Sequence, residues 1–198
     1  MIKEKNKLDR RKVAQKLLKG RKDILVITGL GGTCWDITSA GDDDLNFPMW
    51  GGMGGASMVG LGLAIAQPDK KVLVVTGDGE MLMGLGSLAT IAAADPENLS
   101  IIVFDNEHFG ETGMQKTHTA KGTDLVKVAE AVGFRNVSVI ENQESLESFD
   151  IKTHSQNGPM FCVIKISNNN PTPVLPPRDG AYLKDRFRQA LLGKKSAI

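Results

Sequence analysis

The sequence has few cysteines, little net charge and no long apolar run, and each shortage excludes a class of protein. Its two cysteines, Cys34 and Cys162, provide neither a disulfide framework nor the spacing of a metal site. We therefore expect reduced thiols in a cytoplasmic protein. A net charge of +1 gives no indication of a nucleic acid or membrane-surface partner. No apolar stretch is long enough to span a membrane, and the start lacks the apolar segment of a signal peptide.

Apolar and charged residues are present in ordinary proportions. The 198 residues are 41% hydrophobic and 24% charged, which suits a single compact domain over residues 1–198. Basic residues gather near the N-terminus, and we interpret them as a solvated helix face rather than as a binding patch. They are Lys3, Lys5, Lys7, Arg10, Arg11 and Lys12.

Short apolar runs alternate with longer stretches of helical spacing. The short runs predict strands at 23–28, 71–76, 99–104, 137–140 and 160–166. The helical spacing predicts helices at 8–18, 54–66, 85–94, 124–132, 144–149 and 179–192. Because the strands lack polar alternation, we expect both of their faces to be buried between helices, as in a parallel sheet. The predicted fold class is therefore α/β, a three-layer α/β/α domain with a mainly parallel sheet.

Glycine is abundant, and its placement marks particular turns. The 22 glycines gather at 29–32, 51–62, 77–86 and 110–113. Loops rich in glycine, aspartate or asparagine follow three of the predicted strands, at 29–35, 77–80 and 105–113. In parallel sheets, ligands bind beyond the carboxyl ends of the strands. These loops are therefore the predicted binding region.

Two polar residues end neighbouring predicted strands. Asp78 lies between two glycines after one strand, and Asn106 follows the next strand, 28 positions later (106 − 78). One right-handed crossover fits that gap and places the two strand ends side by side. A carboxylate and an amide oxygen can then share a Mg2+ ion with a diphosphate group. Asp78 could instead cap the next helix and Asn106 could serve a turn, but the pair together favours the metal.

Gly77-Asp78-Gly79 followed by Asn106 resembles the signature of the thiamine diphosphate enzymes, and the likeness extends over about residues 20–190. The resemblance implies thiamine diphosphate and Mg2+ as cofactors. The metal ligands that it implies are the side chains of Asp78 and Asn106 and the backbone carbonyl of His108.

The same resemblance implies roles for other loop residues. Backbone atoms of Gly51 and Met53 would hold the aminopyrimidine ring, and the Met53 side chain would force the cofactor into its bent shape. Core packing is the alternative for Met53. Gly32 and Thr33 would contact the diphosphate. The remaining cofactor residues that the resemblance implies are Gly29, Gly52, Gly77, Gly79, Glu80, Phe109 and Gly110.

A narrower likeness concerns segments 86–91, 110–115 and 117–119, which resemble sulfopyruvate decarboxylase β subunits and the matching half of phosphonopyruvate decarboxylases. It implies conversion of a short anionic 2-oxo acid to an aldehyde and CO2. In this family the glutamate that activates the cofactor comes from another domain, which implies an α subunit carrying the pyrimidine-binding domain. The chain could instead serve a carboligase or a 2-oxoacid oxidoreductase, or be a non-catalytic subunit that retains the fold.

Some residues depart from the family or carry no firm role. Glu80 stands where relatives often have serine or alanine. Its carboxylate would repel a diphosphate, so we expect the side chain to turn outward. Glu111 and His118 are candidates for substrate contact or proton transfer, or simply polar loop residues. Trp35 and Trp50 could line the site, a subunit interface or the core.

Overall fold

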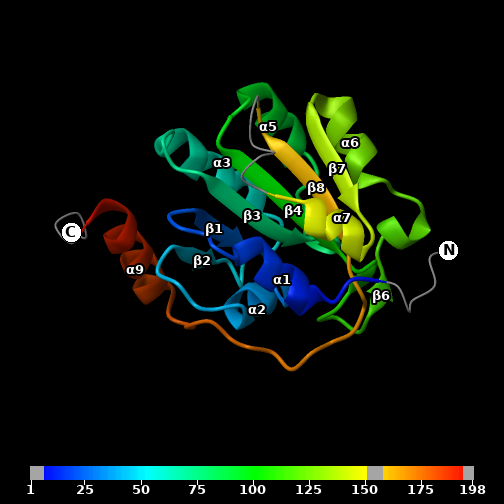
Figure 1. Ribbon diagram of the computed structural model, residues 1–198, viewed down its shortest axis with the longest axis horizontal. Coiled ribbons are helices and arrows are strands. Elements are labelled where there is room, and N and C mark those ends of the chain that lie inside the picture. The colour runs from blue at the N-terminus through cyan, green and yellow to red at the C-terminus, as the bar shows by residue number, and fades with distance from the viewer. Residues whose placement is uncertain (1–6, 151–157, 194–198) are drawn as a thin grey trace.

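A six-stranded parallel sheet forms the centre of the computed structural model, which describes residues 7–150 and 158–193. The strand order is β2-β1-β3-β4-β8-β7, and a separate antiparallel hairpin joins β5 to β6 (Figure 1). The strands are β1 (Leu25–Thr28), β2 (Asn46–Pro48), β3 (Val72–Gly77), β4 (Leu99–Asp105), β5 (His108–Phe109), β6 (Gln115–Lys116), β7 (Asn136–Ile140) and β8 (Met160–Lys165).

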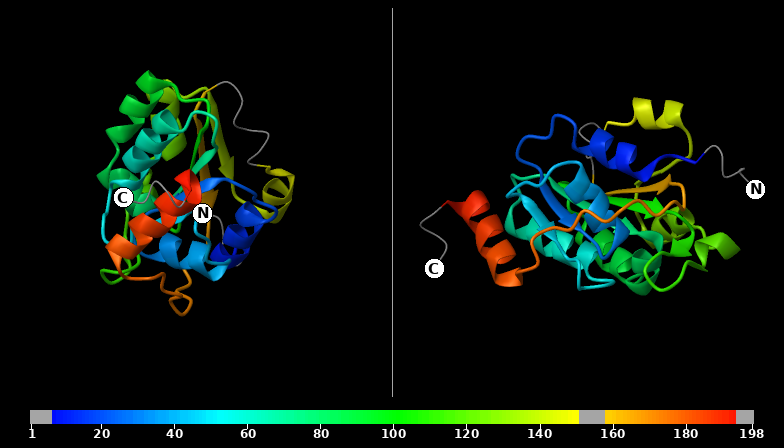
Figure 2. Two further views of the ribbon diagram at one scale, coloured as in Figure 1. Left: turned by 90° about the vertical axis from the view of Figure 1, so that its left-hand side faces the viewer. Right: turned by 90° about the horizontal axis from the view of Figure 1, so that it is seen from below.

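Successive side chains of a strand enter two different cores, because strand residues alternate between the faces of a sheet. In β3, Val72 and Val74 pack in one core, whereas Leu73 and Val75 pack in the other. Helices cover both faces of the sheet (Figure 2). One face carries α1 (Arg10–Leu18), α2 (Gly32–Ser39) and α7 (Gln143–Ser148), and the other α3 (Ala56–Ala66), α5 (Ser87–Ala94) and α6 (Leu125–Val132). This confirms the predicted α/β/α layers and the mainly parallel sheet.

The C-terminal part of the described chain passes around the sheet edge. Residues 167–179, a segment rich in proline and asparagine, form neither helix nor strand, and they lead below α2 to α9 (Gly180–Leu192) (Figure 1). There the Phe187 ring meets the Phe47 ring of β2 edge-on, with centroids 5.6 Å apart. None of the helices in the described ranges has the length and hydropathy needed to cross a membrane.

Several short elements escaped the sequence prediction. Helix α2 begins at Gly32, inside the segment predicted as a loop, and packs Ile37 into the core. Helix α4 (Asp78–Met83), strand β2, the β5–β6 hairpin and a 3-10 turn at Thr119–Lys121 were also missed. The strands and the 3-10 turn are too short for periodicity to identify, whereas α2 and α4 begin in glycine-rich segments, where tertiary packing outweighs a weak helix propensity.

The interpretation of the N-terminal basic residues as a solvated face is wrong for Arg10. Arg10 is only 7% exposed, and its Nε donates a 2.7 Å hydrogen bond to the buried carboxylate of Asp36. Arg10 precedes Val13 by three positions and Leu17 by seven, so it lies on the buried face of α1. The patterning of charge alone did not reveal this.

Some of the neighbouring basic residues form ion pairs, and others are exposed to solvent. Lys7 donates to Glu107 over 2.8 Å, and Arg11 contacts Asp36 over 3.1 Å, whereas Lys12 is exposed. Lys3 and Lys5 lie outside the described residues. Part of the basic run therefore forms ion pairs that join the N-terminal segment to the rest of the molecule.

Candidate active site

A cavity of about 150 Å³ lies at the carboxyl ends of β1, β3 and β4. All three loops that the sequence singled out contribute to its wall, through residues 30–33, 77–80, 106 and 108–112. The remaining lining residues are Arg10, Trp35, Met53, Phe104 and Asn170. The strand order explains the convergence, because β3 lies between β1 and β4 in the sheet.

Asp78 begins α4 directly after β3, and it is 2% exposed. Two hydroxyl groups donate to the same carboxylate oxygen, Oδ2: Thr117 over 2.5 Å and Thr119 over 3.1 Å. Within the described chain no side chain donates to Oδ1. The two threonines therefore fix the orientation of the carboxylate and leave one oxygen available for a ligand.

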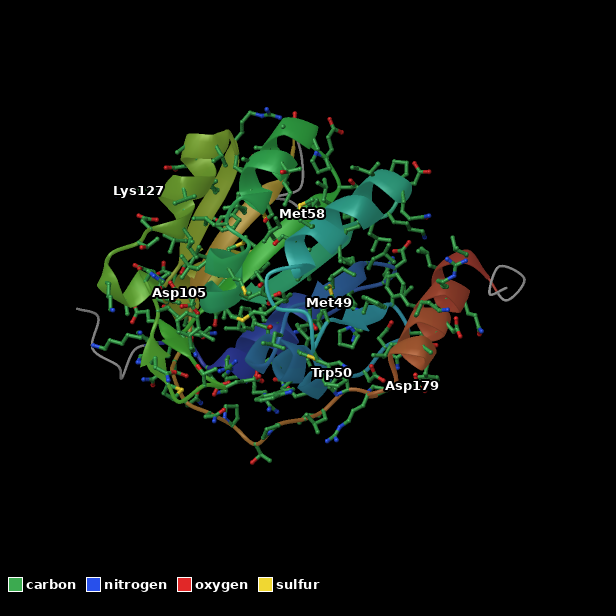
Figure 3. All side chains as sticks on the ribbon, turned by 180° about the vertical axis from the view of Figure 1, so that it is seen from behind. Met49, Trp50, Met58, Asp105, Lys127 and Asp179 are labelled. Carbon is green, nitrogen blue, oxygen red and sulfur yellow. The ribbon has the colours of Figure 1, made fainter. Side chains whose placement is uncertain are left out.

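A second carboxylate lies close to Asp78. Asp105 accepts hydrogen bonds from Thr119 Oγ1 at 2.9 Å and from Lys165 Nζ at 2.6 Å (Asp105 is labelled in Figure 3). Burial and, to a lesser extent, the nearby charge of Asp105 raise the pKa of Asp78 to about 6. A carboxylate held in this way gains from a cation, because a cation offsets both the lost hydration and the repulsion.

Asn106 directly follows β4 and is 8% exposed. Its Oδ1 accepts a 3.0 Å hydrogen bond from the backbone N–H of His108, and the His108 ring nitrogen Nδ1 lies 2.9 Å from the Asn106 carbonyl oxygen. This local turn draws the His108 backbone towards the cavity, which both residues line. The imidazole is occupied by its contact with the backbone.

Glu80 does not turn outward as expected. It is 4% exposed and accepts hydrogen bonds from Thr76 Oγ1 at 2.9 Å, Leu30 N at 3.0 Å and Gly54 N at 3.3 Å. Burial raises its pKa, and these donors oppose the rise. These three donors replace the water molecules that a solvated carboxylate would bind. The sequence could not reveal them, because they come from different segments. Glu80 therefore joins the loop after β1 to the loop before α3.

Two glycines of the predicted cofactor loops are required by close approaches. A methyl group on Gly29 would collide with the Glu80 carboxylate, and one on Gly79 would lie 2.5 Å from Cε1 of the Phe109 ring. Gly79 and Phe109 both line the cavity, whereas Gly29 is not among the lining residues. Gly29 thus belongs to the frame of the site rather than to its wall.

The predicted pyrimidine loop is only partly in the cavity. Met53 lines it and is 38% exposed, so core packing does not describe this side chain. Gly51 and Gly52 are not among the lining residues. The adjoining Trp50 is 40% exposed, and Trp35 lines the cavity (Trp50 is labelled in Figure 3).

The two candidates for proton transfer differ in position. Glu111 lines the cavity, with an exposed side chain. His118 is exposed between the buried Thr117 and Thr119 and is not among the lining residues. His118 precedes the 3-10 turn at Thr119–Lys121, and the chain there buries the two threonines and leaves the histidine exposed.

Several residues that shape the site were missed from sequence. Arg10 could have been identified from its place on the apolar stripe of α1, whereas Thr117 and Thr119 lie at a turn and carry no strand or helix pattern. Lys165 and Asn170 carry no local signal, because only the folded chain brings them to the loops after β4 and β1.

The residues present fit a hard divalent cation. No three His, Cys, Asp or Glu side chains of the described ranges come together as a metal cluster. A cation here would therefore need amide and carbonyl oxygens beside the one carboxylate. Asp78 with Asn106 and the His108 carbonyl offers such a set of oxygens, and Mg2+ completes its shell with water and phosphate oxygens.

Comparison with known proteins identifies the family to which the chain belongs. The sequence profile described as "Thiamine pyrophosphate enzyme, C-terminal TPP binding domain" matches residues 37–164. The chain belongs to this family of thiamine diphosphate (thiamine pyrophosphate) enzymes, whose cofactor the resemblance correctly predicted.

Within this family, the chain is similar to particular decarboxylases. The chain is 37% identical over 178 residues to the sulfopyruvate decarboxylase subunit beta of Methanocaldococcus jannaschii, covering 87% of this chain and 90% of the relative. It is 38% identical over 145 residues to the phosphonopyruvate decarboxylase of Streptomyces viridochromogenes, covering 73% of this chain and 36% of that one. These relatives are carboxy-lyases by name.

A solved structure supports the fold. Benzoylformate decarboxylase from Polynucleobacter necessarius superposes with a TM-score of 0.70 at 18% identity, over 84% of this chain and 34% of that chain. The chain therefore spans about a third of that solved protein. At this identity the likeness concerns the fold alone.

Proposed function

We propose that the chain, as a single domain over residues 1–198, is the β subunit of a thiamine diphosphate- and Mg2+-dependent decarboxylase. Its substrate would be a short anionic 2-oxo acid of the sulfopyruvate or phosphonopyruvate type, and its products an aldehyde and CO2. The observation that carries the proposal is the buried Asp78 carboxylate, fixed through Oδ2 with Oδ1 left available, beside Asn106 at the next strand end. The similarity to named decarboxylase β subunits supports the choice of reaction.

In this proposal each loop has a separate task. Asp78, Asn106 and the His108 carbonyl would hold Mg2+, and the metal with Gly32 and Thr33 would hold the diphosphate. Met53 would support the bent cofactor. The bound cofactor would supply the electron sink for loss of CO2. Glu111, which lines the cavity, is better placed than His118 to deliver a proton after that loss.

Exposed apolar side chains beside the cavity support a partner subunit. Trp50, Met53 and Met83 are 40%, 38% and 67% exposed, respectively. Large apolar side chains gathered near a site indicate an interaction surface. An α subunit placed there would bring the activating glutamate to the cavity rim. The two buried free cysteines, whose pKa values burial raises to about 11, fit a cytoplasmic location.

The proposal is tested by assaying the chain together with its α subunit. Sulfopyruvate, phosphonopyruvate, pyruvate and benzoylformate would be compared in the presence of thiamine diphosphate and Mg2+. We expect turnover of one of the two anionic substrates and little with the chain alone. Equal rates on pyruvate and benzoylformate with none on sulfopyruvate or phosphonopyruvate would contradict the substrate class. Cofactor uptake without decarboxylation of any 2-oxo acid would favour a non-catalytic subunit.

A further inference from the structure

Arg10 reaches the cavity from outside the three loops. It lies on α1, yet its guanidinium sits directly against Gly32, the first residue of α2, so that a methyl group on Gly32 would collide with Nη2. Arg10 and Gly32 both line the cavity. A charged side chain that is 7% exposed needs partners for its donors within the protein, in cavity water or in a ligand.

The hydrogen bonds of Arg10 leave part of the guanidinium unused. Nε donates to Asp36 Oδ2 at 2.7 Å, and Nη1 makes only a long 3.5 Å contact with the carbonyl of Asn169. Within residues 7–150 and 158–193, Nη2 forms no hydrogen bond. The unused donor is the one that lies at the N-terminus of α2, where the backbone N–H groups also lack helical partners.

The charges around Arg10 do not cancel. Asp36 is shared with Arg11, whose Nε lies 3.1 Å from Oδ1, so two guanidinium groups meet one carboxylate. Among the described lining residues, Arg10 is the sole Lys or Arg, whereas Asp78, Glu80 and Glu111 are acidic. One divalent cation beside Asp78 leaves most of the charge of a diphosphate unbalanced. Arg10 is the group of the described wall that can offset it.

We propose that Arg10 binds the terminal phosphate of the cofactor through Nη2, acting with the N-terminus of α2. This assignment rests on the proposed function. Guanidinium groups suit tetrahedral oxyanions because their N–H donors are fixed in one plane. The same chemistry would suit the sulfonate or phosphonate of a substrate. The cofactor is favoured because Gly32, which lies against Nη2, belongs to the loop expected to hold the diphosphate.

The test compares two ligands that differ by one phosphate. Binding of thiamine diphosphate and of thiamine monophosphate would be measured by calorimetry in saturating Mg2+, with the full chain and its α subunit. Arg10→Gln should weaken thiamine diphosphate binding about 10- to 100-fold and leave thiamine monophosphate nearly unchanged. Arg10→Lys, which keeps the charge, should lie between. Because only the ratio of the two affinities is interpreted, a general loss of stability does not imitate the result.

Arg11→Gln is the matched control. Arg11 also bonds Asp36 and additionally donates to the Thr172 carbonyl at 2.7 Å, but it does not line the cavity. It should keep the wild-type ratio of the two affinities. The proposal is overturned if Arg10→Gln and Arg10→Lys also keep that ratio while the wild-type protein binds thiamine diphosphate.

Two further outcomes separate the alternatives. If Arg10→Gln keeps the ratio but raises KM for sulfopyruvate and not for pyruvate, the anion belongs to the substrate, and the assignment to the cofactor is wrong. If the wild-type protein with its α subunit takes up no thiamine diphosphate at all, both the proposed function and the role of Arg10 fail.

Discussion

The hydroxyl of Thr117 donates a 2.5 Å hydrogen bond to Oδ2 of Asp78, a residue 39 positions earlier in the chain. The contact exists because the β5–β6 hairpin folds back, with Thr117 N donating to the Glu107 carbonyl at 2.9 Å. Thr117 is fully buried, so the bond does not compete with water. Groups that orient a metal ligand commonly affect metal affinity almost as strongly as the ligand itself.

Thr117→Val should therefore weaken Mg2+ binding about tenfold while the fold is retained, because valine matches the shape of threonine but cannot donate. The measurement is a Mg2+ titration of the chain with its α subunit at saturating thiamine diphosphate. Thr123→Val, a change of the same chemistry at a threonine that does not donate to Asp78, should leave the affinity unchanged. Equal Mg2+ affinities for Thr117→Val and wild type would show that the second donor, Thr119, is sufficient.

The sequence predicts which loops form the site, but it does not predict the hydrogen bonds that hold the side chains of those loops in place. Parallel strands without polar alternation fix which loops meet, so Asp78 and Asn106 were brought together as predicted. The orientation of Glu80 depends on donors at Thr76, Leu30 and Gly54, which belong to three different segments. No local pattern encodes such a contact. Glu80 was therefore predicted to turn outward, although the fold offers it internal partners.

Charge is the least reliable guide in this sequence. Arg10 lies in a basic run, and the run predicted solvation. Arg10 nevertheless shares a helix face with Val13 and Leu17, and in the structure that face is buried. A buried arginine is tolerated there because Asp36 faces it from α2. The apolar spacing of the helix, rather than the charge of the residue, decides burial here because Asp36 on the opposing helix supplies a partner. The sequence of α1 alone does not reveal that partner.

Asp78→Asn should stabilise the metal-free chain at neutral pH. The folded state raises the pKa of Asp78 from 3.8 to about 6, so folding favours the protonated acid. The stability that Asp78 contributes is complete below about pH 4 and is lost as the pH rises through about 6. Above that pH the ionised carboxylate is held unfavourably, and asparagine removes this cost, by about 1–3 kcal/mol.

Urea unfolding of the metal-free chain between pH 4 and 8 checks this expectation. The advantage of Asp78→Asn should grow between pH 4 and 6 and then level off, whereas Asp69→Asn, at an exposed position, should show no such window. Calorimetry should at the same time show loss of thiamine diphosphate uptake with Mg2+ by Asp78→Asn. A variant that binds both as tightly as wild type would remove Asp78 from the metal site.

Gly29 and Glu80 should behave as a coupled pair. Gly29→Ala places a methyl group against the Glu80 carboxylate and should cost about 1–3 kcal/mol of stability. Glu80→Ala leaves the N–H groups of Leu30 and Gly54 without this acceptor and should cost a similar amount. The double variant removes the collision, so its loss should be smaller than the sum of the single losses. Denaturant unfolding measures all three, with Glu97→Ala as an exposed control. Strict additivity would refute the coupling.

Met83 offers a test of the partner surface. It ends α4 with 67% of its surface exposed, and a methyl group on Gly54 would lie 3.2 Å from its Cγ, so it adjoins the Met53 loop. Met83→Asp should weaken association with the α subunit at least about tenfold, because a covered carboxylate without a partner costs free energy. The chain alone should keep its thermal stability, since the side chain is already in water.

Sedimentation of the two subunits mixed at a series of concentrations measures the effect of Met83→Asp. Leu192→Asp is the matched control, because Leu192 is also a large exposed apolar residue, at 46%, but lies at the end of α9. The control should associate as wild type does. If Leu192→Asp disrupts the complex and Met83→Asp does not, the α subunit covers the side of the molecule that carries α9. The activating glutamate would then have to reach the cavity from a different direction.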